Sequence, residues 1–387
     1  MKKKKAISLE TFVFLAVLAF IICYLQSVMG LGPMFSTLMN TAHSLLLEVV
    51  FYIMAISVIA AAFSALATDF GVIALLNKLI SPIMRPIYGL PGAASLGIVT
   101  TFISDNPAIL SLAKDKGFRQ YFSRNQFPAL CNLGTSFGMG LILCTYMIGL
   151  GTGNEFISSV GCGLLGAFIG SIFSVRIMIK LTSGFYKKQA AVNTEYSAND
   201  ELAAPDDSRY VAEGSLFNRI FNCILEGGKT GVQLGLEIIP GVLTVCTIVM
   251  ILTYGPGTVD GAAAYTGAAY EGVALIPRLG AFLQPVTGVL FGFHDASAIA
   301  FPLTALGSSG AAMGLVPGML ANGAGGNEIA VFTAIGMCWS GYLSTHISMM
   351  DSLHKRELTG QAIISHTIGG LIAGMAAHFS FLLFSMI

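Results

Sequence analysis

The stretch Thr101-Phe-Ile-Ser-Asp-Asn-Pro-Ala108 interrupts an apolar run from Gly92 to Leu112 with a carboxylate, an amide and a proline. Proline has no N–H group and breaks a helix, and an unsatisfied backbone group in lipid is costly. Broken backbone therefore persists at membrane depth only where protein or a water-filled cavity satisfies it. We predict that residues 92–112 form a re-entrant hairpin with Ser104, Asp105 and Asn106 at its tip.

The composition of the 387-residue chain indicates a lipid environment, because 55% of the residues are hydrophobic, 10% are charged and the mean hydropathy is +0.77. Soluble globular domains carry about 25% charged residues. The 20 Lys and Arg balance the 20 Asp and Glu, which leaves no net positive field to attract a nucleic acid. Seven cysteines without a CxxC pair are typical of small hydrophobic side chains. These features exclude a cytosolic enzyme and predict neither catalytic activity nor a resident metal.

Apolar stretches recur along the chain, and at about 1.5 Å per residue each can cross a hydrocarbon core of about 30 Å. A second run, Pro285–Met319, is broken midway by Gly, Pro and polar residues. We predict an all-α polytopic membrane protein with about seven transmembrane helices plus two re-entrant helical hairpins. The predicted spans are Thr11–Met29, Ala42–Leu66, Pro128–Gly151, Ile157–Leu181, Gly231–Tyr254, Asn327–Met350 and Gln361–Met386.

The distribution of basic residues predicts the orientation of these spans. With both broken runs re-entrant, Lys2–Lys5 and nearly all other basic residues lie on one side, and only Arg278 lies opposite. The positive-inside rule makes that side cytoplasmic. We therefore expect a multi-pass protein of the bacterial cytoplasmic (inner) membrane with a cytoplasmic N-terminus.

The chain reads as an internal duplication. Leu-Leu-Leu-Glu-Val-Val at 45–50 is echoed by Leu-Gly-Leu-Glu-Ile-Ile at 234–239, and the first tip can be aligned with Gly307-Ser308-Ser309-Gly310. The charge pattern gives the halves opposite orientations, as in inverted-repeat secondary transporters. The predicted segments are an extra N-terminal helix (1–30), a first repeat (42–181), a cytoplasmic linker (182–213) and a second repeat (214–387).

Polar residues within the apolar runs are the candidates for chemistry. Two facing hairpin tips would form a polar pocket near the midplane, and Glu48 and Glu237 are carboxylates within spans, where such groups are costly and usually functional. An imidazole beside a carboxylate suits a proton relay or metal site. Surface turns, helix–helix hydrogen bonds and capping are the structural alternatives. The candidate substrate- or ion-binding residues are Ser104, Asp105, Asn106, Glu48, Glu237, Asn132, Ser136, His294, Asp295, Ser308, Ser309 and Asn327, and weaker candidates are Thr135, Asn322, Glu328, His346 and Asp351.

Three stretches carry a family resemblance: Leu-Glu-Ile-Ile-Pro-Gly-Val at 236–242, Pro-Gly-Ala-Ala-Ser-Leu-Gly at 91–97 before Ser-Asp-Asn-Pro-Ala, and the Gly-rich second hairpin. They resemble the nucleoside-recognition, or Gate, domain family, and are most similar to its YjiG/YjiH-like and spore-maturation A/B-like members. The resemblance implies a pore-and-gate module related to concentrative nucleoside transporters and to the membrane part of ferrous iron transporter B. It also implies that Asp105, Asn106, Ser308 and Ser309 line the translocation path. The glutamate-bearing hairpin signature of the nucleoside transporters and the cysteine-lined pore of the iron transporter are absent from this sequence.

The leading hypothesis is an ion-coupled secondary transporter of a small polar solute such as a nucleoside, an amino acid or a related metabolite, driven by Na⁺ or H⁺. A divalent-cation permeation module and a partner-dependent protein that does not transport are the alternatives. The expected partners are the solute or ion and the lipid bilayer. Related transporters often form homo-oligomers, although no interface is apparent in the sequence.

Overall fold

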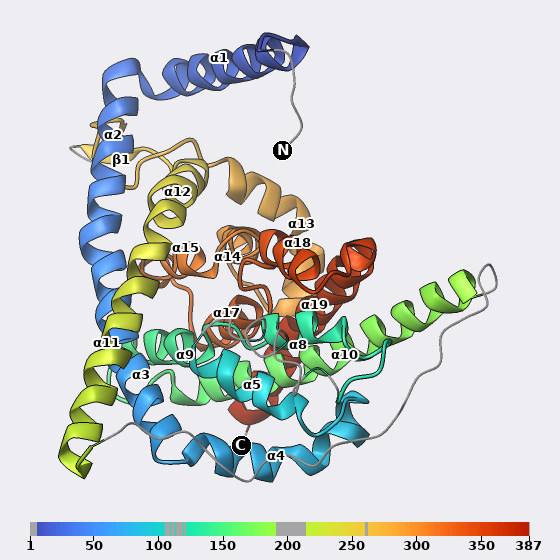
Figure 1. Cartoon of the computed structure of the whole chain (residues 1–387). Coiled ribbons are helices and arrows are strands. Elements are labelled where there is room, and N and C mark those ends of the chain that lie inside the picture. Colours follow the sequence, from blue (N-terminus) through green and yellow to red (C-terminus); the bar gives the residue numbers. More distant parts are fainter. Residues whose placement is uncertain are drawn as a thin grey trace.

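Two long helical columns lie side by side in the computed structural model, which describes residues 6–104, 109, 113, 119, 121–190, 214–259 and 262–386 (Figure 1). The first column consists of α2 (Leu31–Ser44), the π-helix η1 (Leu45–Val50) and α3 (Phe51–Asp69). The second consists of α11 (Leu216–Gly241), the π-helix η2 (Val242–Cys246) and α12 (Thr247–Thr253). We call them the long pair.

Glycines on α11 allow the two columns of the long pair to approach closely. A Cβ atom at Gly231 would lie 2.4 Å from the Cα atom of Val58 in α3, so a larger residue would force the columns apart. Gly227 and Gly235 lie one turn on either side and are equally close to α3. At one end of the pair, Arg219 Nη2 lies 2.6 Å from the Asp69 carboxylate. The long pair is therefore joined both by packing and by charge.

The first half of the chain continues from the long pair into a hairpin arm and a broken helix. Helix α1 (Leu9–Met29) precedes the pair, and α4 (Val72–Tyr88) leads to α5 (Ala94–Ile103). The predicted span Pro128–Gly151 is two helices, α8 (Ala129–Thr135) and α9 (Gly140–Gly149), separated by a break. Helix α10 (Ile157–Ala190) extends nine residues into the predicted linker, so its helical part ends later than we expected.

The second half begins with α11, η2 and α12 of the long pair. After the hairpin β1 (Gly257–Val259) and β2 (Ala262–Ala264), helix α13 (Leu275–Phe291) leads to the second re-entrant hairpin. Its arms are η3 (Ala296–Ile299) with α14 (Ala300–Ala305), and α15 (Ser309–Met313) with α16 (Val316–Ala321). The predicted span Asn327–Met350 is again two helices, α17 (Gly326–Cys338) and α18 (Tyr342–Ser352), followed by η4 (Arg356–Leu358) and α19 (Thr359–Ser385).

The boundaries of the second hairpin differ from those that the sequence predicted. Pro285 lies inside α13, which meets the hairpin arm at an angle of 80°. The hairpin therefore begins at Ala296 rather than at Pro285, and its return arm ends at Ala321. The tip lies at Leu306–Ser308, within a residue or two of the predicted Gly307–Gly310.

Small residues join the last helices of the two halves. A Cβ atom at Gly166 of α10 would lie 2.5 Å from the Ala373 carbonyl oxygen of α19, and one at Gly170 would also collide with α19. Such small-residue stripes let membrane helices approach closely, because lipid offers no hydrophobic driving force between them.

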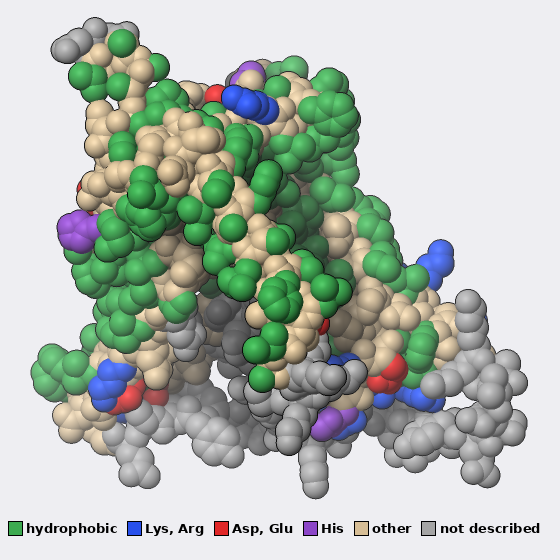
Figure 2. Space-filling view, turned by 90° about the horizontal axis from the view of Figure 1, so that it is seen from above, with side chains coloured by type: hydrophobic (Ala, Val, Ile, Leu, Met, Phe, Trp, Pro, Cys, Tyr) green, Lys and Arg blue, Asp and Glu red, His purple; other side chains and the backbone are tan. Residues whose placement is uncertain are grey.

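The surface matches a lipid solvent. Within the described ranges, five helical stretches are long and apolar enough to cross a membrane, or six if the bent pair of α13 and α14 is counted as one span. Exposed apolar side chains lie on these helices, such as Phe63 on α3 and Phe282 on α13, and Phe217 is likewise exposed on α11. Figure 2 shows one face that is largely hydrophobic, with its few charged side chains near the edges. The chain is a multi-pass membrane protein.

The segment between α12 and α13 is fastened to α2 through a buried carboxylate. Glu271 accepts hydrogen bonds from the backbone N–H of Thr266 at 3.0 Å, from that of Gly267 at 2.9 Å and from the hydroxyl of Thr37 on α2 at 3.4 Å. Burial by itself raises the pKa of Glu271, but the hydrogen bonds from Thr266, Gly267 and Thr37 outweigh it and lower the pKa below its ordinary value.

Candidate functional site

The tip of the second hairpin is built from a helix end and a capping serine. Ser308 caps α15, since its Oγ accepts from the N–H of Ala311 at 3.1 Å, while its own N–H donates to the Thr304 carbonyl at 2.9 Å. The neighbouring Ser309 is buried, and its hydroxyl donates to the Gly336 carbonyl of α17. The two candidate serines therefore position the tip against the next broken helix.

The break between α17 and α18 is closed by groups from other elements. Gly341 has a φ of 60° and donates its N–H to the Ala305 carbonyl at 3.1 Å, while Leu343 donates to the Leu306 carbonyl at 3.4 Å. On its other side, the Cys338 carbonyl accepts from His366 Nε2 of α19. Hairpin tip and helix break thus satisfy each other's backbone groups, as broken backbone in a membrane requires.

The break between α8 and α9 is closed mostly by its own chain. The N–H groups of Phe137, Gly138 and Gly140 each donate to the carbonyl three residues earlier, at 3.2, 3.3 and 3.3 Å. Met139 adopts a left-handed conformation with φ of 55°. Ser136, a candidate site residue, is fully buried, and its hydroxyl donates a hydrogen bond to the Asn132 carbonyl at 2.8 Å.

The two breaks lie against each other and against the second hairpin. The Cys338 thiol is 3.8 Å from the Ser136 carbonyl oxygen, which joins the end of α17 to the end of α8. Tyr146 of α9 donates its hydroxyl to the Met313 carbonyl of α15 at 3.0 Å. Polar backbone of three elements therefore meets in one region, which is buried except at the hairpin tip, where Gly307 is exposed. We call this region the crossing: residues 136–139, 306–309 and 338–341.

Helix α5, the described part of the predicted first hairpin, approaches the crossing. Phe102 packs against Gly140, where a Cβ atom would lie 2.2 Å from the ring. Ser104 ends α5 and donates its hydroxyl to the Thr100 carbonyl at 2.9 Å. Asp105 and Asn106, the strongest candidates from the sequence, lie outside the described residues.

Asn132 is a buried hydrogen-bonding residue of α8. Its Nδ2 lies 2.7 Å from Ser365 Oγ and 3.0 Å from Ser174 Oγ, so it joins α8 to α19 and α10. Its Oδ1 atom has no partner within the described part of the chain. The contacts of Asn132 therefore fit the structural alternative, in which it joins helices by hydrogen bonds instead of binding a solute. Ser136 bonds within its own helix.

Four candidates gather at the base of the second hairpin instead of its tip. Glu328 Oε1 lies 3.2 Å from His294 Nδ1, and the His294 side chain is 86% exposed. Asp295 caps η3 by accepting from the N–H of Ser297. Asn327 donates to the Phe291 carbonyl at 2.9 Å and contacts His378 Nδ1 at 2.7 Å. One hairpin arm, about 15 Å of helix, separates this base from the tip.

The two matched glutamates occupy the long pair. Glu48 is exposed in η1 and accepts from Ser44 Oγ at 2.9 Å, and Ser44 in turn contacts the Tyr270 hydroxyl at 2.7 Å. Glu48 thus bonds within its own helix. Glu237 lies on α11, and its side chain lies outside what the structure describes. Gly241, one turn after it, approaches Ser308, with 3.1 Å between a Cβ atom built there and Ser308 Oγ.

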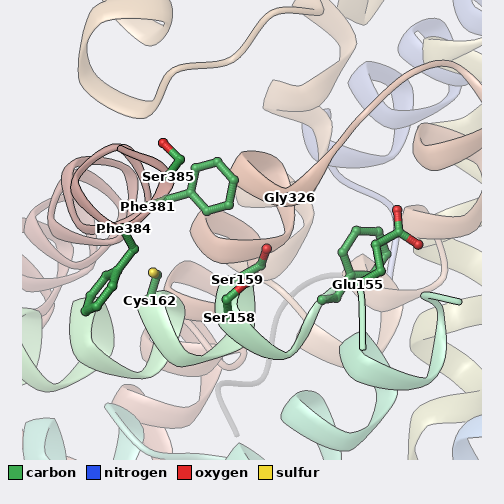
Figure 3. A pocket seen from close by; sticks show the side chains of 9 residues that line it. Glu155, Ser158, Ser159, Cys162, Gly326, Phe381, Phe384 and Ser385 are labelled. Carbon is green, nitrogen blue, oxygen red and sulfur yellow. The ribbon is translucent and has the colours of Figure 1, made fainter. Parts of the chain in front are cut away.

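A pocket of about 260 Å³ lies between the starts of α10 and α17 and the end of α19, and none of its lining residues belongs to the crossing (Figure 3). Its lining mixes hydroxyls and aromatic rings, and Figure 3 shows Ser159 and Phe381 on facing helices. Across the described residues, no group of three His, Cys, Asp or Glu side chains could hold a metal ion.

The described fold is similar to solved structures of CNTnw, a concentrative nucleoside transporter. A double variant in an outward-facing state aligns with a TM-score of 0.54 at 15% identity, covering 86% of this chain and 76% of that chain. A second outward-facing variant gives a TM-score of 0.52 at 15% identity over 86% and 75%. A variant in an intermediate state gives 0.51 at 15% identity over 84% and 74%.

The likeness is one of fold. The predicted fold class, a polytopic all-α membrane protein, is confirmed by it, and the chain shares its architecture with a transporter rather than with an enzyme. The sequence matches no protein-family model and no curated protein. Membership of the Gate-domain family, the inverted repeat and the count of seven spans stay predictions.

Sequence reasoning missed the two helix breaks and His366. Both breaks had a signal, because Gly138-Met139-Gly140 and Ser340-Gly341 interrupt apolar runs in the way that glycine punctuates regular structure. His366 stands alone in an apolar span, and only the fold brings it to the carbonyl that the second break leaves free.

Proposed function

We propose that the protein is a secondary transporter that moves a small polar organic solute across the membrane at the crossing. The observation that carries the proposal is the docking of the second hairpin tip on the second break, next to the break between α8 and α9. Helix ends and freed backbone groups meeting inside a membrane are the means by which such transporters bind solutes and ions. The similarity of the whole fold to a transporter known in several states supports this reading.

The binding residues we propose at the crossing are Ser308, Ser309 and Ser136, and we propose Ser104, Asp105 and Asn106 of the predicted first hairpin as further binding residues. Asn132 lies one turn from the first break and supports it. Glu48 and Glu237 of the long pair are proposed as carboxylates that bind a cation or a polar group of the solute. His294, Asp295 and Asn327 are proposed to line the entrance at the hairpin base. We further propose that an ion gradient drives transport, and nucleosides are the first solutes to test.

The test is uptake into liposomes that contain the purified full chain, with nucleosides, amino acids and dipeptides offered one at a time, with and without Na⁺ and a proton gradient. Saturable uptake of one class above protein-free liposomes is the expected result. Asp105→Ala is expected to lower that uptake at least about tenfold, the effect of losing about 1.4 kcal/mol of binding. The control variant is Ser385→Ala, at the exposed end of α19. An equal loss of uptake in this control would contradict the assignment of Asp105 as a binding residue. No uptake of any class under every gradient would overturn the proposed function.

A further inference from the structure

A buried polar network lies beside the second break. His366 is fully buried, with its Nε2 at the Cys338 carbonyl and its Nδ1 2.8 Å from Ser174 Oγ. A carbonyl oxygen only accepts, so Nε2 carries the hydrogen, and in the neutral ring Nδ1 accepts from the Ser174 hydroxyl. Both nitrogens of His366 are therefore occupied.

Asn132 completes this network. It donates to Ser174 Oγ and to Ser365 Oγ, and the Ser365 hydroxyl donates onward to the Gln361 carbonyl at 2.7 Å. Each hydroxyl thus has one defined donor and one defined acceptor. The network fixes His366 in one tautomer and ties α8, α10 and α19 together.

His346 of α18 lies beside this network but does not take part in it. Its ring centroid is 4.6 Å from that of His366 and 5.4 Å from that of Tyr342, and its side chain is fully buried. Neither of its nitrogens makes a hydrogen bond of good geometry within the described residues, although the Tyr342 carbonyl, one turn earlier on α18, interacts with the ring. An unpaired buried polar group costs about 1–3 kcal/mol, so packing alone does not account for an imidazole at this position.

The titratable groups around His346 are few. Helix α19 presents His366, α18 itself carries Tyr342 and the exposed Asp351, and α8 carries Cys131. The element η4 meets α18 with the exposed Arg356 and Glu357, and α17 ends at Cys338. No described carboxylate lies within ion-pair distance of the His346 ring. The described residues therefore provide no counter-ion for an imidazolium at this position.

We propose that His346 is the proton-binding site through which transport is coupled to a proton gradient, an inference that rests on the proposed function. In the packed conformation the ring is neutral. When α18 shifts at the break and water reaches the ring, a nitrogen of His346 takes one proton from that water and later returns it to water on the other side. Two conformations that differ in proton affinity are linked to the gradient by necessity.

The break supplies the joint for such a shift. Gly341 allows the turn, and α18 is held to the hairpin tip by hydrogen bonds of 3.1 and 3.4 Å, the second of them long. His366 is not the coupling site in this account, because both of its nitrogens already hold structural partners.

The test compares the full-length wild type with His346→Phe, which keeps a ring of similar size but cannot titrate. The unfolding midpoint in detergent is measured between about pH 8 and about pH 5, the interval in which histidine titrates. At the upper pH we expect the variant to unfold at the same temperature or higher, since it removes an unpaired polar group. On acidification we expect the wild-type midpoint to fall by about 2–4 °C more than that of the variant.

Equal pH responses of wild type and variant would overturn the proposal, and so would a variant that is much less stable at both pH values, which would indicate a structural role. If His346→Phe fails to fold, His346→Gln serves instead, because an amide is polar but does not titrate. In the liposomes, acidifying the outside should stimulate wild-type uptake and not that of the variant. Absence of uptake by wild type would overturn the proposed function while leaving the unfolding comparison intact.

Discussion

The two helix breaks solve the same problem in different ways. The break between α8 and α9 satisfies its amides within its own chain, through Phe137, Gly138 and Gly140. The break between α17 and α18 depends on the second hairpin and on His366. A locally closed turn keeps its hydrogen bonds when its neighbours move, whereas a break closed by neighbours must exchange partners. We therefore expect the second break to move more readily than the first.

Removing His366, the partner that α19 provides to the second break, should have the largest effect. His366→Phe leaves the Cys338 carbonyl without its partner from α19 and removes the acceptor of the Ser174 hydroxyl hydrogen, while Asn132 still donates to Ser174. We expect a loss of about 2–4 kcal/mol in the free energy of unfolding. Ser136→Ala at the first break removes the hydroxyl that donates to the Asn132 carbonyl, but this carbonyl still accepts from the backbone N–H of residue 136. We therefore expect a loss of less than about 1 kcal/mol. Denaturant unfolding in detergent measures both. Similar losses for the two variants would remove the distinction between the breaks.

A smaller effect is expected at Gly341. Gly341→Ala places a Cβ atom 3.1 Å from the Gly307 carbonyl oxygen and adds left-handed strain of about 1–2 kcal/mol. Gly153 has the same φ of 60° but open space around it, so Gly153→Ala adds the strain alone. We expect uptake to fall about tenfold for Gly341→Ala and to stay near wild type for Gly153→Ala. Equal uptake by the two variants would show that the contact between tip and break is unimportant.

The smallest effect concerns the loop before α13, which is far from both breaks in the chain. Because the pKa of Glu271 is lowered in the folded protein, its stabilising effect is complete above the ordinary carboxyl pKa and is lost as the pH falls through the lowered value. Amide exchange at Thr266 and Gly267, corrected for intrinsic rates, should therefore increase only in acid. In Glu271→Gln, amide exchange at these two residues should show no such pH dependence. This result would distinguish the pH response of the loop from that of His346.

The sequence predicted what depends on local composition and missed what depends on tertiary partners. The apolar runs, the second hairpin tip near Ser308 and the long helices α10 and α19 follow from hydropathy and from Gly and Pro. The start of that hairpin was wrong because Pro285 is tolerated inside α13. His294 was expected in a proton relay or metal site and Asn327 in the wall of a binding pocket, and only the fold shows that both lie at the hairpin base. The role of His366 likewise depends on a carbonyl 28 residues away.

Cross-linking the second hairpin tip to the second break tests the central claim most directly. The Leu343 N–H donates to the Leu306 carbonyl at 3.4 Å, so Leu306→Cys and Leu343→Cys place one thiol on each side of this contact. Loss of free thiols on oxidation verifies that the disulfide forms. Cys23 is exposed, the other native cysteines are buried, and Cys23→Ser removes the competing thiol. Uptake of the solute that wild-type liposomes accumulate most is measured before oxidation, after it and after reduction. The account predicts that oxidation abolishes uptake and reduction restores it, and full uptake by the cross-linked protein would contradict it.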